Sequence, residues 1–180
     1  MAYTMTNAIE LSHIQKTFPQ FALRDVSLAV PTGTICGLVG ENGAGKSTLI
    51  LILMGALRPD SGAAVTLGAD VSAPDFLRVK EDIGVVLDEG CFPDTLTAPQ
   101  VGRVMAATYR RWEQDTFDAY CRRFALPEKT AFKDYSRGMK MKLTIAVALS
   151  HQAQLLVLDE ATAGLDPIVR DEILELFNEF

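Results

Sequence analysis

The chain has 180 residues, a formal net charge of −6 and a sequence pI near 4.9. This length fits one domain with a real core, and 48% apolar with 22% charged residues is a globular composition. The acidic balance and the lack of a basic tract argue against a general nucleic-acid binder. The longest apolar stretch, residues 49–57, is far shorter than the roughly 18 residues of a membrane helix, and residues 1–9 lack the core of a signal peptide.

The cysteines and histidines give no pattern of a metal centre. Cys36, Cys91 and Cys121 are widely spaced and form no C-x-x-C pair, which favours reduced thiols in a cytosolic protein. His13 and His151 stand alone and are interpreted as surface or packing residues. The bulk properties therefore indicate a cytosolic α/β domain.

Hydrophobic patterning predicts a small, partly antiparallel sheet beside a parallel core. Strands are predicted for residues 9–14, 25–30, 35–39, 63–67, 83–87 and 155–158. The run 35–39 is apolar, as expected of a buried parallel strand, and the apolar run 49–54 begins a buried helix.

Residues 95–150 are predicted to form a helical insertion. Thr97 and Gln100 are spaced as a capping box, with Pro99 in the first turn. A second helix follows Trp112. Its apolar stripe, which favours helix packing over a cofactor site, comprises Phe117, Tyr120, Cys121 and Phe124. A last helical pattern, residues 173–180, runs to the final residue with no Gly or Pro stop signal, so we expect a truncated chain.

The most informative stretch is a glycine-rich loop between the predicted strand 35–39 and the helix after it. The loop comprises Gly40, Glu41, Asn42, Gly43, Ala44, Gly45, Lys46, Ser47 and Thr48. It matches G-x-x-x-x-G-K-[ST], in which glycines turn backbone N–H groups toward phosphate oxygens and the helix dipole adds to the positive field. Lys46 is expected to reach the β- and γ-phosphates and Ser47 to ligate Mg²⁺. The alternative, a turn with an incidental lysine, is disfavoured by the flanks.

Two acids directly follow the predicted strand 155–158. A buried strand delivers a carboxylate to its C-terminal end, where ligands bind in open α/β sheets. Asp159 is expected to hold Mg²⁺ with Ser47, and Glu160 to polarise an attacking water. Alone this pattern is weak, but after a phosphate-binding loop it is much stronger.

A second anion site is suggested by Tyr-Ser-Arg-Gly-Met-Lys at residues 135–140. Ser136 is a natural N-cap, and Gly138 lies in the first turn of the helix that follows. An ordinary capped helix explains the same residues, and without further context it is the simpler interpretation.

Taken in order, G-E-N-G-A-G-K-S-T, Y-S-R-G-M-K, L-L-V-L-D-E-A-T and A-G-L-D-P resemble the Walker A, signature, Walker B and D-loop motifs of an ABC transporter ATPase subunit. The resemblance covers residues 9–180. It implies an α/β P-loop NTPase fold: a RecA-like core with a parallel sheet, a small antiparallel β subdomain and a helical subdomain. The implied parts are residues 1–94, 95–150 and 151–180.

The resemblance also implies partners. Two such domains dimerise head to tail, so that Ser136 and Gly138 of one copy face the γ-phosphate of the ATP bound to the other. A transmembrane permease is the other partner, no nucleic acid is expected, and the protein is expected to be cytoplasmic and peripheral on the inner face of the cell membrane.

Single residues carry over in the same way. Phe18 resembles the aromatic that stacks on adenine, although a buried sheet aromatic is the alternative. Asp166 resembles the D-loop aspartate that contacts the partner, and Glu160 the catalytic base that works with Lys46. Asp88 departs from the family, because a glutamine is usual there. It could still ligate Mg²⁺, and we hypothesise that it couples the nucleotide to the permease.

The sequence thus predicts an ATP-hydrolysing subunit of an ABC transporter, with the signature form and Asp88-Glu89 favouring export. One alternative is a soluble ATPase that acts on ribosomes or DNA. Another is an ATP-binding regulatory module, because Asp88 is unusual and the family's switch histidine would fall beyond residue 180. A GTPase is disfavoured, since no N-K-x-D motif is present.

Overall fold

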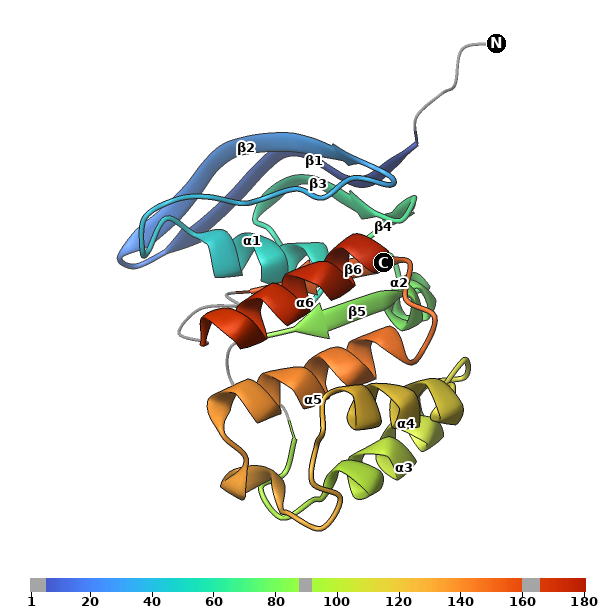
Figure 1. The fold of residues 1–180 in the computed structure, drawn as a ribbon. Coiled ribbons are helices and arrows are strands. Elements are labelled where there is room, and N and C mark those ends of the chain that lie inside the picture. Colours follow the sequence, from blue (N-terminus) through green and yellow to red (C-terminus); the bar gives the residue numbers. More distant parts are fainter. Residues whose placement is uncertain (1–5, 88–91, 160–165) are drawn as a thin grey trace. The chain divides into compact units, whose positions relative to one another are not determined.

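The computed structural model describes residues 6–87, 92–159 and 166–180 (Figure 1). The chain forms two compact units, Met1–Lys80 and Glu81–Phe180, called here the N-terminal and the C-terminal unit. The functional division into residues 1–94, 95–150 and 151–180 stays a prediction.

The N-terminal unit is built on an antiparallel sheet with the strand order β2-β1-β3-β4. Its strands are β1 (Asn7–Phe18), β2 (Phe21–Pro31), β3 (Ser61–Thr66) and β4 (Ala69–Asp70). The predicted strands 9–14, 25–30 and 63–67 are confirmed, and the first two are longer than the sequence pattern indicated.

The pairing of β1 with β2 is irregular near the middle of the hairpin. The register shifts on both sides of Ile14, and His13 and Asp25 adopt φ angles of 54° and 53°. The His13 imidazole Nδ1 lies 2.6 Å from the Asp25 carboxylate. These features are those of β-bulges, which bend a strand and increase its twist.

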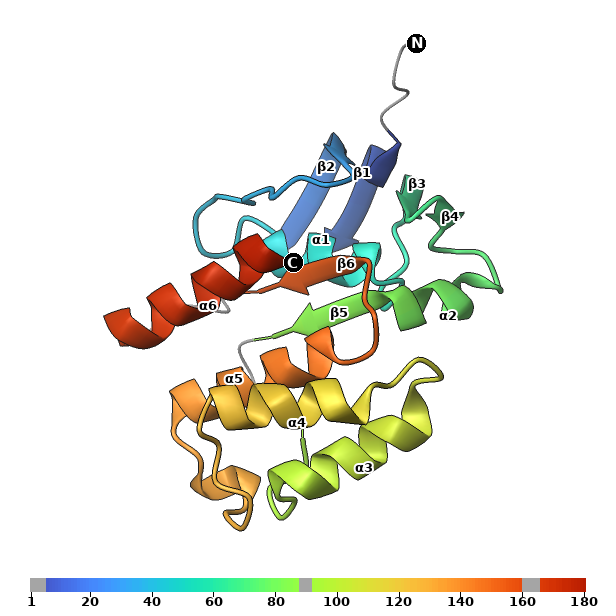
Figure 2. The ribbon, with the colours of Figure 1, turned by 45° about the vertical axis from the view of Figure 1, so that its right-hand side comes forward.

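Helix α1 (Lys46–Leu53) lies beneath the antiparallel sheet in both ribbon views (Figures 1 and 2). Leu49, Ile50, Ile52 and Leu53 are buried, as predicted for the helix after the glycine-rich loop, whereas Leu51 is exposed. The Thr66 hydroxyl of β3 donates a hydrogen bond of 3.0 Å to the Leu53 carbonyl. This bond ties the end of the helix to the sheet. A short helix, α2 (Phe76–Val79), closes the unit and buries Phe76.

The prediction of a buried strand at residues 35–39 is wrong. These residues have no strand hydrogen bonding in the described part of the chain, and Ile35 and Val39 are 76% and 94% exposed. A parallel strand becomes buried only between neighbouring strands and beneath covering helices. Within the N-terminal unit no described strand pairs with this run. The apolar pattern signalled hydrophobicity, whereas burial depends on a pairing partner.

The C-terminal unit contains a parallel pair of strands, β5 (Ile83–Val86) and β6 (Leu155–Leu158). The predicted strands 83–87 and 155–158 are confirmed. Around them lie α3 (Ala98–Thr108), α4 (Gln114–Arg123), α5 (Arg137–Leu149) and α6 (Pro167–Glu179), with 3₁₀ turns at Lys80–Asp82 and Phe132–Asp134.

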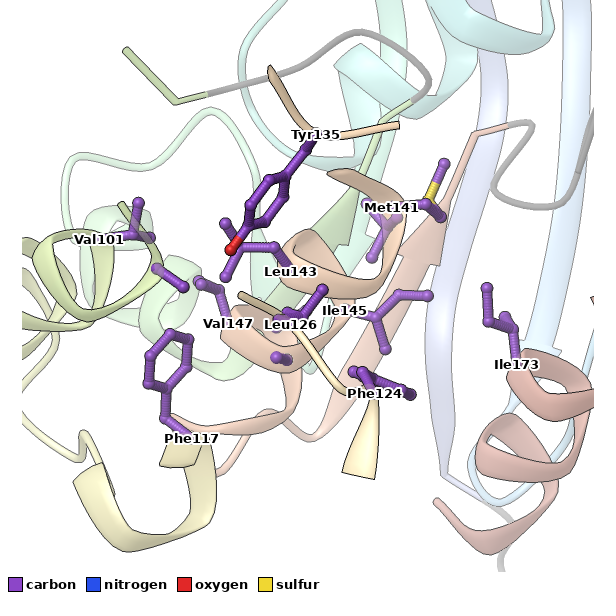
Figure 3. Packing of buried hydrophobic residues seen from close by; sticks show 14 of the residues in the cluster. Val101, Phe117, Phe124, Leu126, Tyr135, Met141, Leu143, Ile145, Val147 and Ile173 are labelled. Carbon is purple, nitrogen blue, oxygen red and sulfur yellow. The ribbon is translucent and has the colours of Figure 1, made fainter. Parts of the chain in front are cut away.

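The core of this unit forms around α5, which packs against β5, α3 and α4. Figure 3 shows Leu143, Ile145 and Val147 of α5 among aromatic side chains of the helical region, including Phe117 and Phe124. Ion pairs join α6 to its neighbours. Lys142 Nζ lies 2.7 Å from Glu172, and the Arg123 guanidinium lies 3.0 Å from Glu179.

The two helices predicted after residue 95 are present as α3 and α4. The Gln100 side-chain oxygen accepts a hydrogen bond of 2.8 Å from the Thr97 N–H, which completes the capping box at the start of α3. In the stripe of α4, Phe117 and the capping residue Phe124 are buried, as packing requires. None of the helices in the described residues has the length and apolar character needed to cross a membrane.

Candidate nucleotide-binding site

The glycine-rich loop, residues 40–48, opens helix α1. Gly45 is the N-cap residue, with the left-handed φ of 94°, and the Leu49 N–H donates the first helical hydrogen bond to the Gly45 carbonyl (2.9 Å). Among the described residues, no side chain caps this helix. Its first N–H groups therefore face the loop with the positive end of the helix dipole, which is the physical basis of an anion site.

Lys46 places its charge across this loop. Its ammonium donates hydrogen bonds to the carbonyls of Gly40 (2.8 Å) and Glu41 (3.0 Å). The side chain is thus folded back over the turn, beside the exposed N–H groups of the helix. Because a cation, a helix N-terminus and open backbone meet here, the loop is suited to phosphate oxygens.

The loop rests directly on strand β2. A Cβ atom at Gly45 would lie 2.4 Å from Phe21 Cζ and 2.6 Å from Leu23 Cδ2, closer than any side chain tolerates. Both the positive φ and the contact therefore demand glycine. The consequence is that the β1–β2 hairpin fixes the place of the glycine-rich loop. Neither Phe21 nor Leu23 belongs to a sequence motif, so this contact has no signal in the sequence.

Phe18 lies at the tip of the same hairpin. Its ring is stacked on that of Phe21, with centroids 6.3 Å apart and planes 24° apart. It is 38% exposed, so it is not the buried sheet aromatic that the alternative required. An open aromatic ring is a platform for a planar base. Phe21 thus contacts both the Phe18 ring and Gly45 of the glycine-rich loop.

In the C-terminal unit, Asp159 follows strand β6 directly. Its N–H donates a hydrogen bond of 2.9 Å to the Val86 carbonyl of β5, so the half-buried residue sits at the carboxyl end of the parallel pair. This is the position that the sequence predicted. Glu160 and Asp88, the predicted catalytic base and the unusual aspartate, lie outside the described residues.

Ser136 caps helix α5, as predicted. Its hydroxyl oxygen accepts a hydrogen bond of 3.2 Å from the Met139 N–H. The preceding residue, Tyr135, anchors this end of the helix. The Tyr135 ring is buried, its hydroxyl donates to the Pro127 carbonyl (2.7 Å), and burial raises its pKa. Ser136 itself is exposed, with Gly138 in the first turn. The N-terminus of α5 is thus a fixed and accessible helix end.

Asp166 is the N-cap of α6. Its Oδ1 accepts a hydrogen bond of 2.9 Å from the Ile168 N–H. Both residues are exposed, Ile168 by 80%. Capping explains the aspartate locally, and its exposure leaves it free to contact another molecule.

The residues predicted to hold Mg²⁺ offer suitable donors. Magnesium prefers hard oxygen ligands, which the exposed Ser47 hydroxyl and the Asp159 carboxylate supply. Within the described residues, no group of three or more His, Cys, Asp or Glu side chains is placed to hold a metal ion. Each oxygen is thus of the kind that Mg²⁺ binds, and each is described within its own unit.

The glycine-rich loop, its lysine and the helix it opens define a P-loop nucleotide-binding protein. Residues 23–163 match the ABC transporter family. The lantibiotic transport ATP-binding protein SrtF of Streptococcus pyogenes is 31% identical over 96% of this chain and 74% of its own length. The chain therefore belongs to the ABC transporter family, and the prediction of the family and of its fold is confirmed.

Further relatives cover several kinds of transport system. The energy-coupling factor transporter ATP-binding protein EcfA2 of Symbiobacterium thermophilum is 34% identical over 94% of this chain and 63% of its own length. The chain spans about half to two thirds of the length of the first such relatives. A solved ATP-binding subunit of an ABC transporter superposes with a TM-score of 0.86 and 27% identity, covering 97% of this chain and 74% of that one.

Proposed function

We propose that this chain is the ATP-binding and ATP-hydrolysing subunit of an ABC transporter that exports a substrate through a partner membrane permease. The observation that carries the proposal is the arrangement of the N-terminal unit. One hairpin holds an open aromatic ring, Phe18, and the loop whose lysine and helix end attract phosphate. A nucleoside triphosphate has the matching parts, a planar base and a chain of anionic phosphates.

In this proposal the triphosphate lies against residues 40–48. Its oxygens replace the Gly40 and Glu41 carbonyls as the hydrogen-bond partners of the Lys46 ammonium. Hydrogen bonds between charged partners are worth about 1.5–3 kcal/mol each, so the exchange favours the bound nucleotide. The N–H groups at the start of α1 add to the same field. The adenine ring stacks on Phe18.

Hydrolysis proceeds by in-line attack of a water on the γ-phosphorus. The new P–O bond forms as the bond from the γ-phosphorus to its bridging oxygen breaks, and ADP and phosphate leave. Glu160 takes the proton of the water, and Lys46 balances the charge of the phosphate oxygens. Ser47 and Asp159 would hold Mg²⁺, which neutralises phosphate charge when bound. Asp88 could take part in the same ligand set.

A second copy of the chain completes the site. Ser136 and Gly138 at the exposed, anchored N-terminus of α5 face the γ-phosphate of the partner's nucleotide, and Asp166 contacts the partner. The dimer works from the cytoplasm, peripheral to the inner face of the membrane, with the permease as its other partner and no nucleic acid.

The direction of transport is supported by the names of relatives. A Bacillus subtilis linearmycin resistance ATP-binding protein, LnrL, is 32% identical over 93% of this chain, beside the lantibiotic transport protein SrtF. A resistance protein and a lantibiotic transport protein among the relatives favour export as the direction proposed for this chain. The Ser-Arg-Gly-Met-Lys signature agrees with this choice. Purification from membranes together with a permease would support a transporter subunit, whereas purification with ribosomes would support a soluble ATPase instead.

The test is ATP binding by isothermal titration calorimetry. Lys46→Ala is expected to weaken ATP binding about 10- to 100-fold, as the loss of a charged hydrogen-bond donor implies. Lys129→Ala, at an exposed position of the C-terminal unit, makes the same change of charge and is expected to bind ATP normally. A wild-type chain that does not bind ATP, or a Lys46→Ala variant that binds it equally well, would contradict the proposal.

Hydrolysis is tested separately by phosphate release. Glu160→Gln is expected to bind ATP normally and to lose turnover. Equal phosphate release by the wild type and by Glu160→Gln would instead favour an ATP-binding regulatory module.

A further inference from the structure

Asp60 makes three contacts with three consecutive residues of strand β1. It lies in the turn between α1 and β3. Its own N–H donates a hydrogen bond of 2.8 Å to the Gln15 carbonyl. Its carboxylate then accepts one hydrogen bond from Lys16 Nζ (2.7 Å) and another from the backbone N–H of Thr17 (2.8 Å). The next residue is Phe18, the ring proposed to stack on the base.

These contacts replace strand pairing at the end of β1. The last pair of β1 with β3 is Gln15 with Ser61, whereas the pairing with β2 continues through Phe18 and Phe21. The Thr17 N–H therefore has no β3 carbonyl opposite it, and the Asp60 carboxylate takes that place. An end of a strand held on one side only would fray more readily. Asp60 thus holds the free side of Thr17, the residue next to the one that carries the ring.

The ion pair also reaches the ring itself. Lys16 Nζ lies 5.9 Å from the centroid of Phe18 while it contacts Asp60, and the Lys16 side chain is only 18% exposed. A cation at this distance interacts with the electrons of the ring. The carboxylate fixes the ammonium there, and the stacking of Phe18 on Phe21 holds the ring from another direction.

The charged state of Asp60 agrees with this geometry. The hydrogen bond from Lys16, helped by that from the Thr17 N–H, lowers the pKa of the carboxyl below its usual 3.8. The carboxylate is therefore ionised at any pH at which the protein would bind a nucleotide.

We propose that Asp60 is a positioning residue for the base of a bound nucleoside triphosphate. It acts through Thr17 and Lys16 on the place of the Phe18 ring, and it contacts neither the nucleotide nor the phosphate loop. This inference rests on the proposed function, because it assumes that Phe18 receives the base. It predicts that Asp60 affects the part of the affinity that depends on the base and leaves the part that depends on the phosphates unchanged.

The experiment compares the binding of ATP with that of inorganic tripolyphosphate, which has no base, to the full chain. Stacking of a base on an aromatic ring is worth about 1–3 kcal/mol, so Phe18→Ala is expected to weaken ATP binding about 5- to 100-fold and tripolyphosphate binding not at all. Asp60→Ala is expected to weaken ATP binding about 3- to 10-fold, a part of the stacking effect. In the Phe18→Ala background, Asp60→Ala is expected to have no further effect.

Two further variants separate positioning from folding. Asp60→Asn keeps an oxygen for the Thr17 N–H and loses the ion pair with Lys16, so its effect on ATP is expected to be smaller than that of alanine. Asp25→Asn is the matched control, because it makes the same change beside His13 on the same hairpin. It is expected to bind ATP as the wild type does. Melting curves of all variants verify that they fold.

The outcomes distinguish the two proposals. If Asp60 variants weaken ATP and tripolyphosphate equally, or weaken ATP as much without Phe18 as with it, Asp60 is not a positioning residue for the base. If Phe18→Ala binds ATP normally, the base platform itself is wrong and this inference falls with it. If Asp25→Asn matches Asp60→Asn, any charge change in the hairpin suffices and the specific role of Asp60 is overturned.

Discussion

Replacing Gly45 by alanine tests the contact between the glycine-rich loop and strand β2. A Cβ atom there would lie 2.4 Å from Phe21 Cζ and 2.6 Å from Leu23 Cδ2, and the φ of 94° is unfavourable for any side chain. Overpacking costs about 1–3 kcal/mol and a strained φ about 1–3 kcal/mol. We therefore expect Gly45→Ala to lower the free energy of unfolding by about 2–6 kcal/mol, a large share of the roughly 5–15 kcal/mol of a typical domain.

The assay is urea unfolding followed by far-ultraviolet circular dichroism. Gly33→Ala is the matched control, since Gly33 has a φ of 74° and open space around the position of a Cβ atom. It is expected to lose about 1–2 kcal/mol from strain alone. Phe21→Leu removes the nearest clashing atom and should partly rescue Gly45→Ala in the double variant. If Gly45→Ala is no less stable than Gly33→Ala, the loop does not rest on β2 in the protein.

Three other predictions concern the C-terminal unit. Burial lowers the pKa of His151 below 6.5, and this effect exceeds the opposite effect of its contact with the Glu81 carbonyl. The unfolded chain therefore binds the proton first, and the free energy of unfolding should fall as the pH drops below 6.5. His151→Phe should flatten this dependence between pH 7 and 5, and an unchanged slope would contradict the prediction. Gly84→Ala should destabilise the unit by about 1–3 kcal/mol in urea unfolding, because its Cβ would lie 2.8 Å from the Ala148 carbonyl oxygen. Ser136→Ala should cost about 1 kcal/mol in the same assay as the cap of α5 is lost, and Ser136→Asn, another good cap, should not.

The features that sequence predicted well are those decided by residues close together in the chain. The capping box of Thr97 and Gln100 and the cap at Ser136 depend on groups three residues apart, so the pattern contains the whole interaction. The stripe that buries Phe117 follows from helical periodicity in the same way. The strand before Asp159 was also predicted, because four apolar residues and a polar end are a local signal.

The features that sequence missed depend on residues far apart in the chain. Nothing near Phe21 indicates that its ring meets Gly45, and nothing near Asp60 indicates that it holds Thr17. The run 35–39 shows the reverse case, because its apolar pattern predicted a strand that the structure does not contain. Pairing requires a neighbour whose identity is not encoded in the run itself, and within the N-terminal unit none of the described strands fills that role.

The bulged hairpin has a consequence for how copies of the protein meet. In the described sheet of the N-terminal unit, β2 is an outer strand, and it presents Arg24 and Asp25 to solvent beside an irregular register. Charges and bulges on an outer strand prevent the strand of a neighbouring molecule from extending the sheet. Open-ended growth of the sheet by addition of strands from further copies is thereby blocked on this side.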